Sequence, residues 1–187
     1  MVFAVNSGII EHNPLSGIRS AFQAPEKKHY PTLLPEQFPR FLQTLFIART
    51  TLTTKCTIEW QLHTMTRPGE AAGTEWQEID FEKKIWDIPA PRMKKKKRHI
   101  VPLSEQAIQI LETMRPISSR SKYVFPSVKG LKMHINPSTA NSAIKRMGYT
   151  NELVAHGMRS IASTVLNEEG FDYDVVESAL AHVDDNE

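Results

Sequence analysis

The stretch VAHGMRSIASTVLNEEG, residues 154–170, holds the pair of polar side chains around which the rest of the sequence is organised. His156 and Arg159 are three residues apart, so a helix would place them on one face, one turn from each other. The pair combines a group that titrates near neutral pH with a cation that stays charged. The glycine at position 170 favours a helix end there. The stretch therefore predicts a helix that carries an anion-binding pair.

Further cationic groups occur on both sides of this stretch. Arg67 lies in a Thr-Arg-Pro-Gly-Glu turn, and the proline after it favours extended backbone at the arginine. The segment 92–98 carries six positive charges in seven residues, and His182 follows in the run LAHVDDNE. Guanidinium groups bind phosphate oxygens in paired, planar hydrogen bonds that lysine does not reproduce. Together these residues predict a phosphate-binding pocket beside a basic hairpin.

Composition excludes several classes of protein. The net charge of the 187 residues is only +2, but no Lys or Arg follows Arg159, whereas eight Asp or Glu do. The single cysteine, Cys56, cannot form an internal disulfide, and we expect it to be a buried structural thiol in a cytoplasmic protein. The sequence contains no signal peptide and no apolar run near the roughly 20 residues of a membrane span. It also lacks the glycine-rich motifs of nucleotide-binding folds.

Hydrophobic periodicity predicts an α+β fold that is mainly helical with a small antiparallel β-sheet. The strand-like runs are residues 75–80, 84–88 and 99–103, and the basic connection between the last two suits a hairpin. We expect Ser104 to cap a helix that ends before Pro116, followed by a loop over 115–135 with a short strand at 122–125. The other predicted helices cover residues 32–49, 54–64, 138–148, the stretch that ends at 170, and 173–180.

The order of these motifs resembles the tyrosine recombinase family, in particular the integrases of phages, prophages and genomic islands. The resemblance covers residues 29–187, which it implies to be the catalytic domain. Residues 1–28 resemble the end of the family's core-binding domain and a linker. The matching segments are TMTRPGEAAGTEWQEID (64–80), RMKKKKRHIVPLS (92–104), HGMR (156–159) and LAHV (180–183).

The resemblance implies a role for each matched side chain. Arg67 and Arg159 would be the catalytic arginines, with Glu70 as a support for the first of them. His156 and His182 would be the two histidines of the site. Counting back from the Val-Pro-Leu strand selects Lys94 as the catalytic lysine, and Lys95 or Lys96 are the alternatives. The DNA-binding residues of the hairpin would be Lys95, Lys96, Lys97 and Arg98.

The resemblance also implies a mechanism and partners. A tyrosine attacks a scissile phosphate of double-stranded DNA at an attachment site, forms a 3′-phosphotyrosine and releases a 5′ hydroxyl. The bond energy is kept in the covalent intermediate, so no cofactor, ATP or metal is required. Members of the family act as homotetramers on DNA, which implies a place in the bacterial cytoplasm, on the nucleoid.

The nucleophile is the point at which the sequence departs from the family pattern. In the family the attacking tyrosine follows the second histidine, but this sequence ends at Glu187, five residues beyond His182. All four tyrosines lie before that histidine: Tyr30, Tyr123, Tyr149 and Tyr173. We therefore expect no nucleophile within these residues, a C-terminally truncated catalytic domain, and a monomer that binds DNA weakly and does not cleave it.

Two other functions fit the same residues. One is a non-catalytic DNA-binding regulator built on the same scaffold, for which the absence of the tyrosine would be genuine. The other is a relative of type IB topoisomerases, which would use the same pocket to relax supercoiled DNA.

Overall fold

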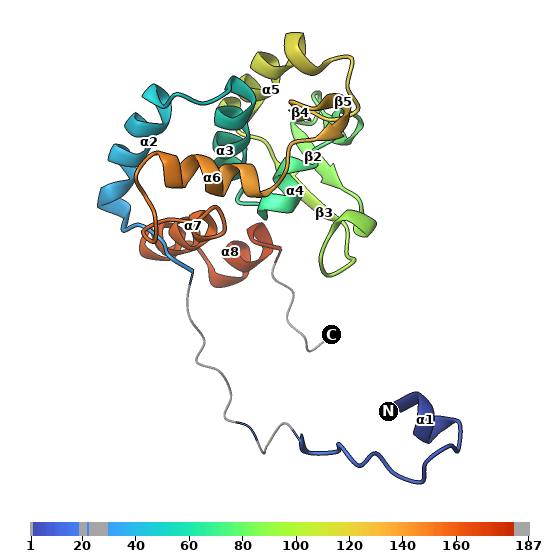
Figure 1. The fold of residues 1–187 in the computed structure, drawn as a ribbon. Helices are drawn as coiled ribbons and strands as arrows, with labels where there is room; N and C mark the ends of the chain where they lie inside the picture. The colour runs from blue at the N-terminus through green and yellow to red at the C-terminus, as the bar shows by residue number, and fades with distance from the viewer. Residues whose placement is uncertain (1, 19–21, 23–29, 182–187) are drawn as a thin grey trace.

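The computed structural model describes residues 2–18, 22 and 30–181 of the chain (Figure 1). Its helices are α1 (Val2–Asn6), α2 (Phe38–Ile47), α3 (Leu52–Thr64), α4 (Pro68–Ala72), α5 (Glu105–Ser118), α6 (Ser138–Arg146), α7 (Gly157–Glu168) and α8 (Tyr173–Ala179). Its strands are β1 (Ile79–Asp80), β2 (Ile85–Ile88), β3 (His99–Pro102), β4 (Pro126–Ser127) and β5 (Gly130–His134). The predicted fold class, mainly helical with a small antiparallel sheet, is confirmed. No helix in this part of the chain is long and apolar enough to cross a membrane.

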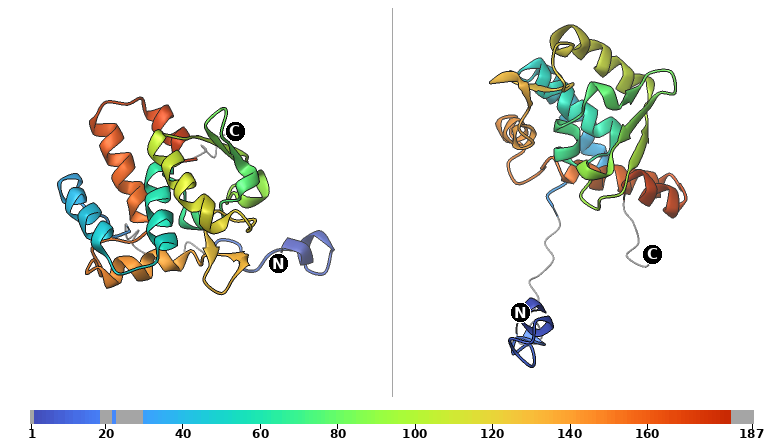
Figure 2. Two further views of the ribbon diagram at one scale, coloured as in Figure 1. Left: turned by 90° about the horizontal axis from the view of Figure 1, so that it is seen from above. Right: turned by 90° about the vertical axis from the view of Figure 1, so that its right-hand side faces the viewer.

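Helix α3 lies at the centre of the fold, and the other elements pack around it (Figures 1 and 2). Its buried side chains spread over a wide arc rather than one narrow stripe, and the remaining face carries the less buried Lys55, Glu59 and His63. Two of its buried polar side chains donate hydrogen bonds: Trp60 Nε1 to Thr74 Oγ1 at 3.0 Å, and Gln61 Nε2 to the Ala155 carbonyl at 2.6 Å. The second of these bonds ties the central helix to the residue just before His156.

Two hydrophobic clusters meet at α3. One joins it to the three-stranded sheet, to α4 and to α5, and it contains Trp60, Trp86 and Phe125, each fully buried. The other joins it to α2, α6 and α7, around Phe41, Ile58 and Ile144. Because α3 contributes to both, it fixes the sheet and the α7 helix relative to each other.

The three-stranded sheet has the order β1-β2-β3, and all its pairs are antiparallel. Strands β2 and β3 pair from Ile85 with Pro102 to Ile88 with His99, so the basic segment 89–98 is the connection of a hairpin, as predicted. A short 3-10 turn at Ala90–Arg92 begins this connection.

The region after β3 differs from the prediction. Ser104 caps α5 as expected, with Oγ accepting from the Ala107 N–H at 3.2 Å, but the helix continues through Pro116 to Ser118. Proline removes only one helical hydrogen bond near this end, and the last turn is held by burial of Ser118 and by Trp76 Nε1, which donates to the Ser118 carbonyl at 3.1 Å. The predicted strand at 122–125 is also wrong. The strands are β4 and β5, and Tyr123 makes only an isolated bridge with Glu75.

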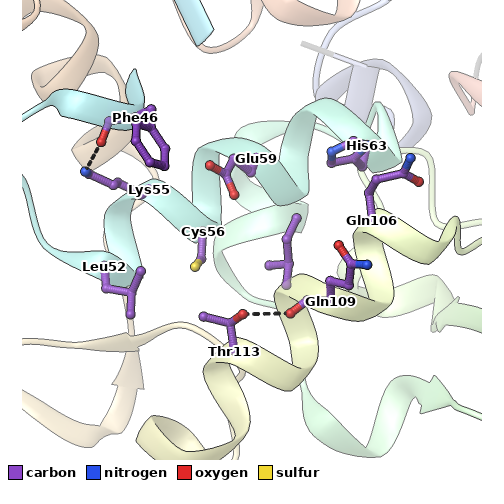
Figure 3. A pocket seen from close by; sticks show the side chains of 10 residues that line it. Phe46, Leu52, Lys55, Cys56, Glu59, His63, Gln106, Gln109 and Thr113 are labelled. Carbon is purple, nitrogen blue, oxygen red and sulfur yellow. Dashed lines mark hydrogen bonds between the residues drawn. The ribbon is translucent and has the colours of Figure 1, made fainter. Parts of the chain in front are cut away.

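Cys56 lies on α3, beside a pocket of about 450 Å³ between α3 and α5 (Figure 3). The pocket is rimmed by polar side chains that include Glu59 and Gln109, but Cys56 is only 3% exposed. Burial, and secondly the charge of Glu59, raises the pKa of Cys56 from 9.0 to about 11. The structure therefore agrees with a structural thiol.

This burial predicts a slow reaction of the single thiol with an alkylating reagent. The raised pKa of Cys56 leaves the thiol protonated at mildly alkaline pH, so the thiolate fraction should be about a hundredfold lower than in the unfolded chain. Iodoacetamide labelling followed by mass spectrometry, in buffer and in urea, measures the ratio. Equal labelling rates in the two conditions would contradict this burial.

Candidate active site

Arg67 is held in place by Glu70 at the start of α4. The Arg67 N–H donates to Glu70 Oε2 at 2.8 Å, and Arg67 Nη1 donates to Glu70 Oε1 at 3.0 Å. Pro68 occupies the first helical position, where its missing N–H costs no hydrogen bond. Glu70 is 5% exposed, so one buried carboxylate fixes both the backbone and the side chain of the arginine. This geometry is the support that the sequence predicted for Glu70.

Arg92 supports the same helix from the hairpin, which sequence reasoning missed. Its Nη2 donates to the Glu70 carbonyl at 2.9 Å, and its Nη1 pairs with Glu78 Oε2. Trp86 Nε1 also donates to Glu78 Oε2, at 3.0 Å. A Cβ on Gly73 would lie 2.8 Å from Arg92 Nη2, so the glycine leaves room for the guanidinium. Arg92 belongs to the basic run in sequence, but here it joins the hairpin base to α4.

Arg159 is buried, with 6% of its surface exposed. Its Nη1 donates to the carbonyl of Met65 and its Nη2 to the carbonyl of Leu180. These two residues are the C-caps of α3 and α8, where carbonyl groups lack helical partners and the helix dipole is negative. Burial, and secondly the charge of Arg67, lowers the pKa of Arg159 to about 10. At neutral pH the residue is still a cation.

His156 is half-buried and occupies the N-cap of α7, just outside the helix on which the sequence had placed it. Burial lowers the pKa of His156, and the charges of Arg159, Arg67 and Lys94 lower it further, while Glu70 acts in the opposite direction. These charges act on one imidazole because the structure brings together groups from α4, α7 and the hairpin. The imidazole is therefore neutral at physiological pH.

The backbone around His156 is anchored on both sides. The Ala155 N–H donates to Asn141 Oδ1 of α6 at 2.7 Å, and the Ala155 carbonyl accepts from Gln61 of α3 at 2.6 Å. Farther along, the Arg159 N–H donates to the His156 carbonyl at 3.2 Å. The His-Gly-Met-Arg segment is thus positioned by the two helices that flank it.

The basic hairpin borders a hollow of about 200 Å³ beside Arg67. Lys95, Lys97 and Arg98 line it from the hairpin, and Ser178 and Ala181 line it from the α8 side. The segment 94–98 is exposed. The hollow is therefore small and open to solvent, and four cations border it, Arg67, Lys95, Lys97 and Arg98, which suits a phosphate.

The lysines and arginine of the hairpin differ in their surroundings. Arg98 forms a two-pronged ion pair with Asp87, at 2.7 Å from Nε and 2.5 Å from Nη2. Lys96 Nζ donates to the Pro91 carbonyl at 3.0 Å. Lys94 is exposed but near enough to act on the pKa of His156. Of the candidate lysines, Lys94 is thus the one whose charge the structure links to the histidine.

His99, on β3, lies in the same hollow and was not predicted as a site residue. Its ring is hydrogen-bonded to the backbone of Ala179, near the end of α8. Burial lowers the pKa of His99, the charges of Arg159 and Arg67 lower it further, and Glu70 raises it. The sequence held a signal for this placement, since strand alternation puts His99 on the same face as the buried Val101.

The remaining predicted residues are placed as follows. His182 lies outside the described residues. Tyr173 is the first residue of α8 and is 63% exposed, and Tyr149 packs edge-on against Phe41 in the core. The ring of Tyr30 lies against His156, with ring centroids 4.4 Å apart. Within residues 2–18, 22 and 30–181, no three His, Cys, Asp or Glu side chains are grouped to hold a metal ion.

Known proteins share both this sequence pattern and this fold. The model of the Phage integrase family matches residues 31–187. Prophage integrase IntA of Escherichia coli (strain K12) is 49% identical over 187 residues, which cover 100% of this chain and 45% of that protein. The integrase of Enterobacteria phage P4 is 34% identical over 201 residues, which cover 100% of this chain and 46% of that protein. The chain therefore spans about half the length of these curated relatives.

Solved structures agree on the fold. A lambda integrase(75–356) dimer bound to a COC′ core site matches with a TM-score of 0.70 at 16% identity, over 97% of this chain and 65% of that chain. The Tn1549 transposon integrase in complex with circular intermediate DNA matches with a TM-score of 0.70 at 16% identity, over 98% and 67%. With the family match over residues 31–187, these likenesses show that the chain belongs to the phage integrase family and has the catalytic-domain fold of tyrosine recombinases.

Proposed function

We propose that this chain forms the catalytic domain of a site-specific recombinase that cuts and rejoins double-stranded DNA through a 3′-phosphotyrosine. The observation that carries the proposal is the hollow that Arg67 and the basic hairpin line together, near enough to His156 for the charges of Arg159, Arg67 and Lys94 to lower the pKa of its imidazole. A phosphodiester that undergoes transfer carries negative charge on its non-bridging oxygens. Donors fixed in advance around those oxygens stabilise the transition state more than mobile ones do.

The two arginines have complementary positions for this chemistry. Arg67 is partly exposed, with its Nη1 on Glu70, and it lines the hollow, so its guanidinium faces the place where a phosphate would bind. Arg159 lies deeper and is aligned by the carbonyls of Met65 and Leu180. In the proposed reaction Arg67 binds the phosphate directly, and Arg159 supplies a second guanidinium from the buried side of the site.

Proton transfer falls to the hairpin and the histidines. The tyrosine oxygen forms a bond to phosphorus, the bond to the 5′ oxygen breaks, and that oxygen takes up a proton. Lys94 is the proposed donor, because a lysine on an exposed hairpin is free to reach the leaving oxygen. His156, neutral at physiological pH, is suited to accept the tyrosine proton, and His182 is the proposed second histidine.

The proposed partners are DNA attachment sites and further copies of the protein. The solved fold relatives include a lambda integrase dimer bound to a core site and a lambda integrase tetramer bound to a Holliday junction. We propose the same mode of assembly here, in the bacterial cytoplasm on the nucleoid. Residues 1–28 would belong to the end of a core-binding domain and linker, and residues 29–187 to the catalytic domain.

Covalent adduct formation tests the two arginines. In a protein extended at both ends to the length of its relatives, Arg67→Ala should lower the rate of adduct formation on a nicked suicide DNA substrate by about a hundredfold or more, because each lost donor removes several kcal/mol of transition-state stabilisation. Arg159→Lys keeps the charge but loses the planar pair of donors, so it should lower the rate of adduct formation by a similar factor.

The matched control is Arg40→Ala, an exposed arginine on α2, for which the wild-type rate is expected. Thermal unfolding of each variant separates lost chemistry from lost fold. A wild-type rate in the Arg67 variant would remove this residue from the site, and the absence of any adduct in the extended wild-type protein would refute the proposed function.

The hairpin lysines should act through DNA phosphates. Removing one phosphate contact by Lys95→Ala or Lys97→Ala should reduce the slope of log K against log salt by about 0.9. Binding of the 187-residue chain to a short duplex, measured by fluorescence anisotropy over a range of salt concentrations, gives the slope. The control is Lys83→Ala, in the turn at the opposite end of β2. If the slope of log K against log salt is the same for all variants, the DNA does not contact these lysines of the hairpin.

A further inference from the structure

A short segment before α2, residues 30–32, crosses the start of α7 and is called here the strap (Figure 1). The Pro31 carbonyl accepts a hydrogen bond from the Val154 N–H at 3.3 Å. Thr32 Oγ1 donates to the Gly157 carbonyl at 2.9 Å. The strap therefore contacts the backbone on both sides of His156, although more than 120 residues separate them in sequence.

The contact is close enough to restrict the residue at position 157. A Cβ on Gly157 would lie 2.1 Å from the Pro31 carbonyl oxygen and 3.1 Å from the Pro31 carbonyl carbon. Because these are backbone atoms, no side-chain rotation relieves the overlap. The glycine in the His-Gly-Met-Arg segment is thus explained by the approach of the strap, independently of the chemistry of the site.

The first residue of the strap, Tyr30, contacts the imidazole of His156. The ring of Tyr30 lies 4.4 Å from the ring of His156, centroid to centroid, with the planes tilted by 48°. The hydrogen bonds of Ala155 to Asn141 and Gln61 already hold the backbone, so the freedom that remains to the histidine is rotation of its ring. A large, uncharged ring packed against it limits that rotation.

The charged groups around His156 come from the other elements of the site. Arg159 on α7, Arg67 and Glu70 at α4, and Lys94 on the hairpin all act on the imidazole. Tyr30 is the aromatic partner that the structure places against it from the strap. The imidazole thus has an aromatic ring packed against it and lies within range of the charges of the site.

We propose that Tyr30 is a positioning residue for His156, and that the strap makes the geometry of the site depend on the chain that leads into this domain. The proposal rests on the proposed function for its effect on DNA cleavage. It adds that the segment at the start of the domain is a working part of the site: displacing the strap moves the histidine without altering any group that touches the phosphate.

Two variants of the 187-residue chain test the strap without DNA. Tyr30→Ala removes the ring, and Gly157→Ala keeps both rings but pushes the Pro31 carbonyl away. If the strap positions the imidazole, both variants should shift the His156 Cε1–H resonance and its NMR titration midpoint in the same direction, whereas Tyr30→Phe should restore the wild-type values. The resonance is assigned with His156→Gln. The control Tyr173→Ala removes an exposed tyrosine of α8 and should leave the resonance in place.

Cleavage by the extended protein tests the consequence for the reaction. Tyr30→Ala should lower the rate of adduct formation at saturating DNA by about tenfold to a hundredfold, with little change in DNA affinity, because a misplaced catalytic group costs rate rather than binding. Tyr30→Phe should recover most of the rate. A wild-type rate in Tyr30→Ala, or a His156 titration unchanged by that substitution, would overturn the proposal.

The outcomes separate this proposal from the proposed function. If the extended wild-type protein forms no adduct, the proposed function fails, while the NMR titration still decides whether the strap positions His156. If Gly157→Ala does not fold, as shown by circular dichroism, the comparison of Tyr30→Ala with Tyr30→Phe decides alone. If the His156 resonance shifts in Tyr30→Phe as much as in Tyr30→Ala, packing of an aromatic ring is not enough to position the imidazole. That result would also overturn the proposal.

Discussion

The buried guanidinium of Arg159 is the constraint on which the arrangement of this domain depends. Burying a cation is costly unless its donors are satisfied, and here two of them meet the carbonyls at the C-terminal ends of α3 and α8. Those carbonyls lack partners within their own helices and lie at the negative ends of the helix dipoles. One side chain of α7 thus satisfies carbonyl groups at the ends of two other helices, α3 and α8. Any movement of these helix ends relative to each other leaves a buried polar group without a partner.

The end of α3 has a second consequence. Met65 takes a left-handed conformation with φ of 52°, and the chain then turns into the segment that carries Arg67. The same helix end therefore aligns Arg159 directly and determines where Arg67 begins. Burial is the main cause of the lowered pKa of Arg159, repulsion from the Arg67 guanidinium is the second, and the buried carboxylate of Glu70 offsets part of this repulsion. A bound phosphate would offset more of it, so the fold holds the cations in an arrangement that favours an anion.

Around Arg159, several side chains hold the proposed catalytic groups in place without taking part in the proposed reaction. Arg92 ties the hairpin base to α4, Gln61 and Asn141 hold the residue before His156, and the strap packs Tyr30 on the histidine ring. Arg92 joins two elements that both carry proposed catalytic groups, and the other supports join such an element to one that carries none. A site on a loop, a hairpin and a helix N-terminus needs such links, because none of these segments is rigid alone.

Much of this protein follows from local sequence. The spacing of apolar residues, the Ser104 cap and the β-branched runs around the basic segment determined the helices, the hairpin and the fold class, because these signals depend on neighbours within one or two turns. The motif order pointed to Arg67, Lys94, His156 and Arg159, whose roles remain predictions. The continuation of α5 through Pro116, the β4–β5 pair, the Arg92–Glu78 pair, and the places of His99 and Tyr30 were decided only by tertiary structure. The end of α5, His99 and Tyr30 depend on partners far away in the chain, and a contact of that kind leaves no periodic trace in the local sequence. The β4–β5 pair is local, but its register is irregular, so it shows no regular strand alternation.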